Sequence, residues 1–545
     1  MFPSAAFKLV ECMSYRFVFG ASGAGKSTEL HKEIIDRATE SLRAQFVMHE
    51  TADNDESGAA GSKSQAGKVK AANYVFIVPE QYTMQTQKDI VMAHPSRGIL
   101  NIDVLSFGRL SHRIFEEAGT AQVRALGDVG KSLIIRKLAG KIAGSLPVIG
   151  GNLKREGYIS EVKSAISEFM QYGITPEDMN QLIDYAEKDG RRGALVARLK
   201  DLRTIYRAFL DYEHERFVTT EETLDLVAEA VSRSAFAAGS VFVFDGFTGF
   251  TPVQNRVVAQ IMKYAPEVII SLTLSSDGGI TPDEVLTSSS AGAPEDLFYL
   301  TRKTVRDLSA LAADLGVQHD ADEYIGMDRS MKASCVPVRF SATAPLSHLE
   351  KNLFRYPVVP FTDKLCDAEN HCAFRIYEAS SIAEEVRQMC IMISDIIRQR
   401  GFCYRDFAVV TGDMASYEDP VRKYCARYGI PVYVDVAKKV MHNPLIEAIR
   451  GAEKIRSDNW SYESVFHYLR CGLADITADE TDLLENYCLA RGIAGRKKWE
   501  MAFNAQLESV RKTLVDSFAP LYENAENGES AGKRTERLRN FLTQQ

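Results

Sequence analysis

The sequence lacks several features that would place it in particular classes of protein. No apolar run approaches the ~18 residues needed to span a bilayer, and the first residues lack the charged leader and apolar block of a secretory signal. We therefore expect a cytoplasmic protein that has no membrane partner. The 65 lysines and arginines are outnumbered by 73 aspartates and glutamates, which gives a net charge of −8. Any contact with nucleic acid must then come from a local basic patch.

Paired cysteines are missing too. The nine cysteines are odd in number and scattered, and none has C-x-x-C spacing. This pattern favours reduced, mostly buried thiols over a disulfide framework or a metal site built from these cysteines. The chain has 545 residues, of which 45% are hydrophobic. That length allows about three to four domains, each with a core of its own.

The strongest pattern present is a strand, a glycine loop and a helix near the amino terminus. An apolar run over residues 15–19 leads into a complete phosphate-loop (P-loop) motif, Gly20-Ala21-Ser22-Gly23-Ala24-Gly25-Lys26-Ser27. The next segment repeats an apolar residue every four positions, at Leu30, Ile34, Ala38 and Leu42. Backbone N–H groups of such a loop surround phosphate oxygens, and the positive end of the helix points at the same place. Lys26 would reach the β- and γ-phosphates of ATP, and the hydroxyl of Ser27 would hold Mg²⁺.

A second nucleotide motif follows much later in the chain. The apolar run at 241–244 ends in Asp245, where P-loop proteins place the carboxylate associated with Mg²⁺. The separation from Lys26 is 245 − 26 = 219 residues, too long for a minimal nucleotide-binding domain. The helical pattern between the two motifs is therefore predicted to be an insertion within one domain.

The periodicity of apolar residues divides the chain into sheet-forming and helical parts. We expect an α/β nucleotide-binding domain with strands near 15–19, 74–78, 102–105, 241–245 and 268–274. It would be built from residues 1–120 and 236–275, with a helical insertion at 121–235. His49 to Ala71 is predicted to be an exposed, mobile segment, because it has almost nothing to bury.

The second half shows another α/β pattern. A linker with irregular and helical structure is expected over 276–370, followed by part of a second sheet domain at 371–450. Its predicted strands lie at 374–377 and 407–411, and its predicted helices at 384–397 and 419–428. The second helix leads into a further apolar stretch at 429–434. Helices dominate from 451 to 545, which we interpret as a further helical insertion.

Two sheet domains, with a P-loop in the first and an insertion between its nucleotide motifs, resemble the motor of superfamily 1 helicases. Both α/β domains would then be RecA-like, with parallel sheets and helical insertions. Local strings narrow the resemblance to the AddB-type subunit of bacterial AddAB helicase–nucleases. They occur in that family's order along nearly the whole chain, and are Val78-Pro79-Glu80-Gln81, Val104-Leu105-Ser106-Phe107-x-Arg109-Leu110, Phe244-Asp245-Gly246-Phe247-Thr248-Gly249-Phe250-Thr251-Pro252, Tyr404-Arg405-Asp406-Phe407-Ala408-Val409 and Ala490-Arg491-Gly492-Ile493.

The resemblance implies a heterodimer that processes DNA double-strand ends for homologous recombination repair. An AddA-type helicase–nuclease subunit would be the partner and supply the helicase engine. The AddB-type subunit would contribute a nuclease and recognise the recombination hotspot sequence. Single- and double-stranded DNA would be its other partners. We expect this portion to bind ATP with Mg²⁺ and DNA, and to serve recognition and scaffolding with little or no helicase activity of its own.

The sequence departs from this family of motors in two ways. A superfamily 1 motor carries Asp-Glu at the second motif, where the second acid helps to activate water. Here Gly246 follows Asp245, so we expect poor hydrolysis and assign no catalytic residue. Family members also continue into a nuclease domain with an iron–sulfur cluster. The acidic cluster and cysteine ligands of that domain are not recognisable before Gln545. We therefore expect an amino-terminal portion without nuclease activity, and an iron–sulfur cluster only in the missing carboxy-terminal part.

Three residues after the third predicted strand are candidate DNA contacts. Phe107, Arg109 and Arg113 occupy a position that in related motors lies beside single-stranded DNA. Phe107 could stack on a base and the arginines could bind phosphates. The alternative is that Phe107 belongs to the core and the arginines pair with Glu116 and Glu117. Two other functions also stay open: an autonomous P-loop ATPase or kinase, and a non-catalytic scaffold that binds neither nucleotide nor DNA.

Overall fold

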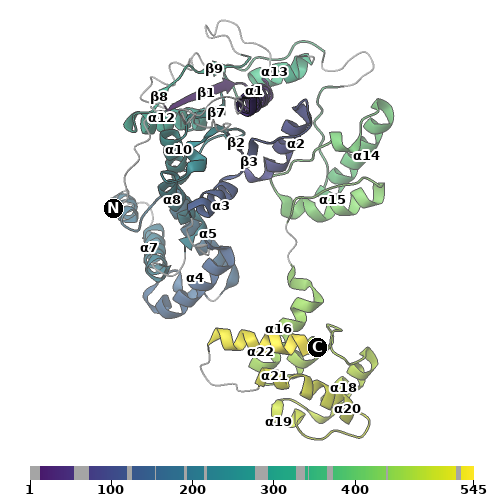
Figure 1. The fold of residues 1–545 in the computed structure, drawn as a ribbon. Coiled ribbons are helices and arrows are strands. Elements are labelled where there is room, and N and C mark those ends of the chain that lie inside the picture. Colours follow the sequence, from purple (N-terminus) through teal and green to yellow (C-terminus); the bar gives the residue numbers. More distant parts are fainter. Residues whose placement is uncertain are drawn as a thin grey trace, which may run out of the picture. The chain divides into compact units, whose positions relative to one another are not determined.

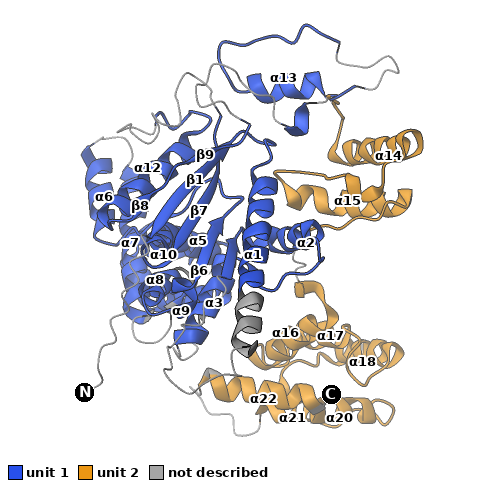
Figure 2. Ribbon diagram, turned by 45° about the horizontal axis from the view of Figure 1, so that its top comes forward, with its two compact units in different colours: residues 1–375 blue, residues 376–545 orange. Residues whose placement is uncertain are grey.

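A computed structural model of the chain is shown in Figure 1. The residues it describes are 13–54, 73–118, 125–153, 155–188, 193–213, 218–275, 292–326, 338–341, 343–364, 372–436, 440–522 and 530–544. The chain forms two compact units, residues 1–375 and 376–545, which are coloured separately in Figure 2.

A parallel sheet forms the centre of the first unit. Its strands lie in the order β3-β2-β6-β7-β1-β8, and β9 also pairs with β1. The strands are β1 (Ser14–Gly20), β2 (Asn73–Ile77), β3 (Ile102–Leu105), β6 (Ser240–Phe244), β7 (Glu267–Thr273), β8 (Gln318–His319) and β9 (Glu323–Tyr324). The five strands predicted for this domain are confirmed, and their pairings are all parallel. The unit is thus a RecA-like α/β fold.

Helices cover both faces of this sheet, as Figures 1 and 2 show. On one face, α1 (Lys26–Asn54) buries Leu30, Ile34 and Ala38 in a cluster that also contains strand residues Val18 and Phe76. The same cluster includes Ile90 of α2 (Thr83–Ala93). The other face is covered by α3 (Phe107–Ala118), α8 (Thr220–Val231), α10 (Pro252–Tyr264) and α12 (Tyr299–Asp314). Burial on both faces explains why these strands are continuous apolar runs.

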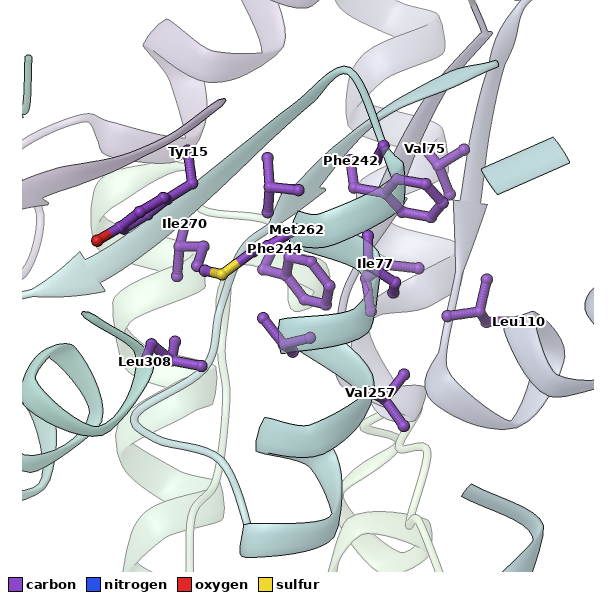
Figure 3. Close-up of a cluster of buried hydrophobic side chains, with 14 of the residues drawn as sticks. Tyr15, Val75, Ile77, Leu110, Phe242, Phe244, Val257, Met262, Ile270 and Leu308 are labelled. Carbon is purple, nitrogen blue, oxygen red and sulfur yellow. The ribbon is translucent and has the colours of Figure 1, made fainter. Parts of the chain in front are cut away.

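Figure 3 shows part of the larger cluster, between the sheet and α10. Phe242, Phe244 and Ile270 extend from the strands and have no solvent exposure. They share the cluster with Val257 and Met262 of α10. The cluster therefore fixes β6, and with it the residue that follows the strand, relative to its neighbours.

The predicted insertion is mainly helical within its described residues. It contains α4 (Asp128–Ile142), α5 (Glu156–Gln171), α6 (Asp178–Lys188), α7 (Gly193–Glu213) and the short strands β4 (Ala125–Leu126) and β5 (Val218–Thr219). These helices have a hydrophobic core of their own, which includes Ile135, Ile166 and Phe209. In contrast, α8 contributes Val227 and Val231 to the core beneath the sheet. The last long helix before β6 therefore packs with the sheet domain.

The segment predicted to be exposed and mobile differs in part. Helix α1 continues through His49 as far as Asn54, because the helical pattern that starts at the P-loop meets no proline or glycine before that point. The rest of that prediction, residues 55–71, lies outside the described residues.

Further along the first unit, η5 (Val338–Phe340) precedes α13 (Ala344–Asn352).

The second unit contains helices but not the predicted strands. Helices α14 (Ile382–Arg400) and α15 (Met414–Tyr428) pack together around Cys390 and Cys425. The two strands predicted at 374–377 and 407–411 are not formed, and the apolar stretch 429–434 is not a strand either. Their exposed side chains include Ile376, Val410 and Tyr433, at 92%, 93% and 87% exposure. A parallel strand needs neighbours to satisfy its backbone, and the described residues provide none here.

From residue 444 onward the described residues are largely helical, in agreement with the sequence pattern. The helices are α16 (Pro444–Ser457), α17 (Tyr462–Leu469), α18 (Ala478–Arg491), α19 (Arg496–Trp499), α20 (Glu508–Ser517), α21 (Ala519–Tyr522) and α22 (Ala531–Gln544). Their core is centred on Trp460, whose ring lies 5.8 Å from that of Trp499 and 5.2 Å from that of Phe518. Both tryptophans of the chain therefore stabilise this one cluster.

No helix in the described part of the chain is both long and apolar enough to cross a membrane. Cys372 is disulfide-bonded, which differs from the expectation of reduced thiols, because spacing along the chain does not report which thiols the fold brings together. Free thiols are found at Cys390, Cys403, Cys425, Cys471 and Cys488.

Candidate functional site

The P-loop joins β1 to α1 at the carboxyl edge of the sheet. Two of its glycines have positive φ, 76° at Gly23 and 102° at Gly25, a conformation that only glycine adopts without strain. A Cβ atom at Gly25 would meet nothing within 4 Å, so glycine is required there by conformation. A backbone hydrogen bond within the loop also holds this turn, because the N–H of Ala24 donates to the carbonyl of Ala21 at 3.2 Å. Ser22 and Ser27 are exposed.

Lys26 lies at the base of this loop. Its ammonium donates hydrogen bonds to the carbonyl oxygens of Gly20 and Ala21, at 2.9 and 3.0 Å. Burial lowers the pKa of Lys26 to about 8, and nearby Asp245 opposes that shift. A desolvated ammonium gains from an anion placed beside it. The geometry thus suits the binding of phosphate oxygens.

Asp245 follows β6 directly and is 6% exposed. Its backbone N–H donates to the carbonyl of Ile77 at 3.0 Å, which extends the pairing of β6 with β2 by one residue. Ser27 and Asp245 both line a cavity of about 780 Å³ beside the P-loop. A hydroxyl and a carboxylate are oxygen ligands of the kind that Mg²⁺ prefers. The two residues predicted to hold Mg²⁺ therefore share one cavity and fit that ion chemically.

The position after Asp245 carries no acid. Gly246 also lines the cavity and has φ of 80°. Two further carboxylates, Asp36 of α1 and Asp89 of α2, line the same cavity. Asp89 accepts a hydrogen bond from Gln85 at 2.7 Å. Neither aspartate follows β6, so neither occupies the position of the acid that a superfamily 1 motor carries after its Mg²⁺-associated aspartate.

The structure adds His31, which the sequence analysis did not single out. This residue lies one helical turn beyond Ser27 and lines the cavity. Its ring packs edge-on against Phe76 at 5.3 Å, and its Nε2 is buried without a hydrogen-bond partner in the described part of the chain. Burial lowers the pKa of His31, an effect that Asp245 and Asp89 oppose. The i, i+4 spacing from Ser27 is the signal that could have identified it.

The candidate DNA contacts lie on α3, and the structure separates Phe107 from the arginines. Phe107 is 9% exposed and belongs to the core beneath the sheet. Its ring lies 6.0 Å from that of Phe244 and 5.7 Å from that of Phe247. This placement favours the core alternative, because a buried ring has no free face for a base. Arg109 and Arg113 are exposed.

The structure also disagrees with the alternative in which Arg109 and Arg113 form ion pairs with Glu116 and Glu117. The guanidinium of Arg113 lies over the ring of Phe236 at 5.3 Å. Glu117 accepts hydrogen bonds from the backbone N–H of Phe236, at 3.0 Å, and from the hydroxyl of Ser234. Within the described ranges, no ion pair joins either arginine to Glu116 or Glu117. Contact with DNA at Arg109 and Arg113 stays a prediction.

Comparisons with known proteins point to one family. A family model described as ADDB, N-terminal matches residues 62–350. The B subunit of an ATP-dependent helicase/deoxyribonuclease from Lachnoclostridium phytofermentans is 33% identical over 530 residues, which are 95% of this chain and 42% of that protein. Proteins of the same name from Acetivibrio thermocellus and Clostridium tetani are 30% and 28% identical, over 94% and 89% of this chain.

The chain spans about two fifths of the length of these relatives, since it covers 42%, 41% and 38% of them. Within this chain, however, the similarity is extensive, because each alignment includes nearly nine tenths of its residues or more. With a family match over more than half of its residues and relatives aligned along most of it, this chain belongs to the AddB family.

Proposed function

We propose that this chain is the ATP- and DNA-binding portion of the AddB-type subunit of a heterodimeric ATP-dependent helicase–exonuclease. The complete enzyme would process DNA double-strand ends for homologous recombination repair, with an AddA-type subunit as the partner. Relatives whose name assigns them to an ATP-dependent helicase/deoxyribonuclease support this proposal. That name describes proteins more than twice as long as this chain, so the activities of the whole enzyme are part of the proposal.

The observation that carries the proposal is the shared cavity of Ser27 and Asp245 beside the P-loop. Lys26 would pair with the β- and γ-phosphates of ATP, and Ser27 and Asp245 would hold Mg²⁺. When bound, Mg²⁺ would neutralise charge on the phosphates. The buried ammonium of Lys26 supports this assignment, because an anion beside it recovers part of the solvation energy that burial removes.

Hydrolysis of ATP is expected to be slow. Gly246 has no group that could polarise water, although it follows the Mg²⁺-associated carboxylate. We propose that the site binds ATP for structural and regulatory purposes, while the AddA-type partner supplies the motor. This role agrees with recognition of DNA and scaffolding as the work of the AddB-type subunit.

Nucleotide binding can be tested with a fluorescent ATP analogue and Mg²⁺. Wild type should bind, and Lys26→Ala should lose at least about tenfold in affinity, because it removes a charge-assisted contact with phosphate. Lys88→Ala is the matched control, since Lys88 is an exposed lysine of α2 outside the cavity. Equal affinity of wild type and Lys26→Ala would reject the proposal. Rapid turnover without DNA or partner would instead favour the autonomous ATPase.

A further inference from the structure

Residues 325 and 326, which follow β9, lie directly against the P-loop. Strand β9 pairs with β1, and the backbone N–H of Ile325 donates to the carbonyl of Phe19 at 2.8 Å. A Cβ atom placed on Gly20 would lie only 2.7 Å from the carbonyl oxygen of Ile325. On the next residue, a Cβ at Gly326 would lie 3.3 Å from the Cβ of Ala24. One side of the loop is therefore covered by a segment far away in sequence.

A second contact of this kind involves Gly23. The backbone N–H of Arg339 donates to the carbonyl of Gly23 at 3.2 Å. A Cβ at Gly23 would lie 3.0 Å from the Cβ of Arg339 and 3.2 Å from the ring of Phe340. Gly23 thus needs to be glycine for two reasons, its positive φ and this close approach. The contact places Arg339 on the loop itself.

The side chain of Arg339 is available for a ligand. Arg339 is exposed and lines the same cavity as Ser27 and Asp245. Within the described ranges, no carboxylate forms an ion pair with its guanidinium. The ammonium of Lys26 is held by loop carbonyls at the base of the site. A triphosphate with bound Mg²⁺ still carries more negative charge than Lys26 alone can balance. Arg339 is a further cation of this cavity, and its planar guanidinium, unlike the ammonium of Lys32, can bind a phosphate through two parallel hydrogen bonds.

We propose that Arg339 binds the terminal phosphate of a nucleoside triphosphate held by the P-loop, and thereby makes the site prefer ATP to ADP. This inference rests on the proposed binding of ATP. We assign the terminal phosphate to Arg339 for the following reason. In P-loop proteins the β- and γ-phosphates lie between the P-loop lysine and the Mg²⁺ ligands. Arg339 lines the same cavity as Ser27 and Asp245, the proposed Mg²⁺ ligands. Arg339 belongs to η5, which precedes α13 in the chain. Its contact with phosphate would therefore also link nucleotide occupancy to that segment.

The test compares the Kd values of MgATP and MgADP for wild type and three variants. Arg339→Gln should weaken MgATP binding about tenfold and MgADP binding less than about twofold, as expected for one lost charge-assisted contact. Arg339→Lys should keep part of the preference, because it retains the charge without the planar guanidinium. Lys32→Gln is the matched control, since Lys32 lines the same cavity from α1 and tests whether any lost cation has the same effect.

Each outcome decides the matter. An unchanged ratio of the two Kd values in Arg339→Gln overturns the inference, and so does an equal loss in Lys32→Gln. If wild type binds ATP and Lys26→Ala does not, while Arg339→Gln behaves as wild type, the proposed function stands and the role of Arg339 falls. If wild type binds neither nucleotide, both fall. Thermal unfolding of every variant verifies that the fold is retained.

Discussion

The carboxylate of Asp245 acts on the ammonium of Lys26 from a strand that is not its neighbour. Strand β7 separates β6, which leads to Asp245, from β1, which leads to the P-loop. Asp245 nevertheless raises the pKa of Lys26, against the stronger effect of burial. Parallel strands end at the same edge of a sheet, so two motifs 219 residues apart meet at one site. We interpret this region as a nucleotide site that lacks a second acid at position 246. That interpretation depends on Asp245 lying close to Lys26.

The affinity for MgATP should fall as the pH rises through about 8. The folded protein lowers the pKa of Lys26 from 10.5 to about 8, so above that pH the lysine must take up a proton to pair with phosphate. The expected loss is up to about tenfold for each pH unit above the shifted pKa. Fluorescent ATP titrations over the neutral to alkaline range measure it. Lys26→Arg should show a flatter profile because arginine keeps its charge. A flat profile in wild type would contradict the prediction.

The ring of His319 should make the stability of the first unit depend on pH. Its Nε2 lies 3.0 Å from Oδ1 of Asp322, which also accepts the backbone N–H of Phe17 at 2.8 Å. The hydrogen bond to Asp322 raises the pKa of His319 above 6.5, with Asp320 adding to the effect.

Because this pKa is raised, the pair stabilises the fold fully below the unfolded-state pKa, and the stabilisation is lost as the pH rises through the folded-state pKa. His319→Gln should therefore differ most from wild type at acidic pH, with the difference in free energy of unfolding shrinking towards pH values well above 6.5. Urea unfolding at several pH values measures this difference. A difference that is constant with pH would show that the pair does not titrate as described.

Two substitutions at Gly246 should distinguish the effect of backbone strain from the effect of adding a carboxylate. The φ of 80° disfavours any other residue, although an added Cβ would make only an ordinary contact of 3.5 Å with Pro79. Gly246→Ala and Gly246→Glu should each lower the free energy of unfolding by about 1 kcal/mol. If the second acid is what the site lacks, Gly246→Glu should hydrolyse ATP faster than Gly246→Ala. Equal rates in the two variants would mean that another group limits hydrolysis.

Arg109 and Arg113 should contribute unequally to DNA binding. Arg113 lies over Phe236, whereas no ion pair or ring contact holds Arg109 within the described residues. Arg109→Gln should weaken binding to a tailed duplex whatever the DNA sequence. It should also reduce the slope of log affinity against log salt concentration by about 1. Arg113→Gln should have the smaller effect. Filter binding at several salt concentrations measures both slopes. Retention without salt dependence in wild type would remove the basis for either contact.

The success of strand prediction differed between the two units for a physical reason. Val75 and Phe242 lie in apolar runs that the sheet buries completely, so the pattern of apolar residues and the structure agree. Val410 and Tyr433 lie in runs that read the same way in the sequence, yet their side chains are largely exposed. An apolar run reports that a segment is suited to a buried strand. It does not report whether neighbouring strands are present to pair with it.

The sequence by itself determined the P-loop, the strand before it, the helix after it and the glycine that follows Asp245, because local spacing encodes each of these. Only the tertiary structure decided which distant groups surround the loop. Phe107 faces the core because α3 packs beneath the sheet. The pairing of β9 with β1 places Ile325 beside the loop, and Arg339, in a separate described segment, lies against Gly23. Contacts of this kind depend on the order of strands in the sheet, which no local pattern of residues records.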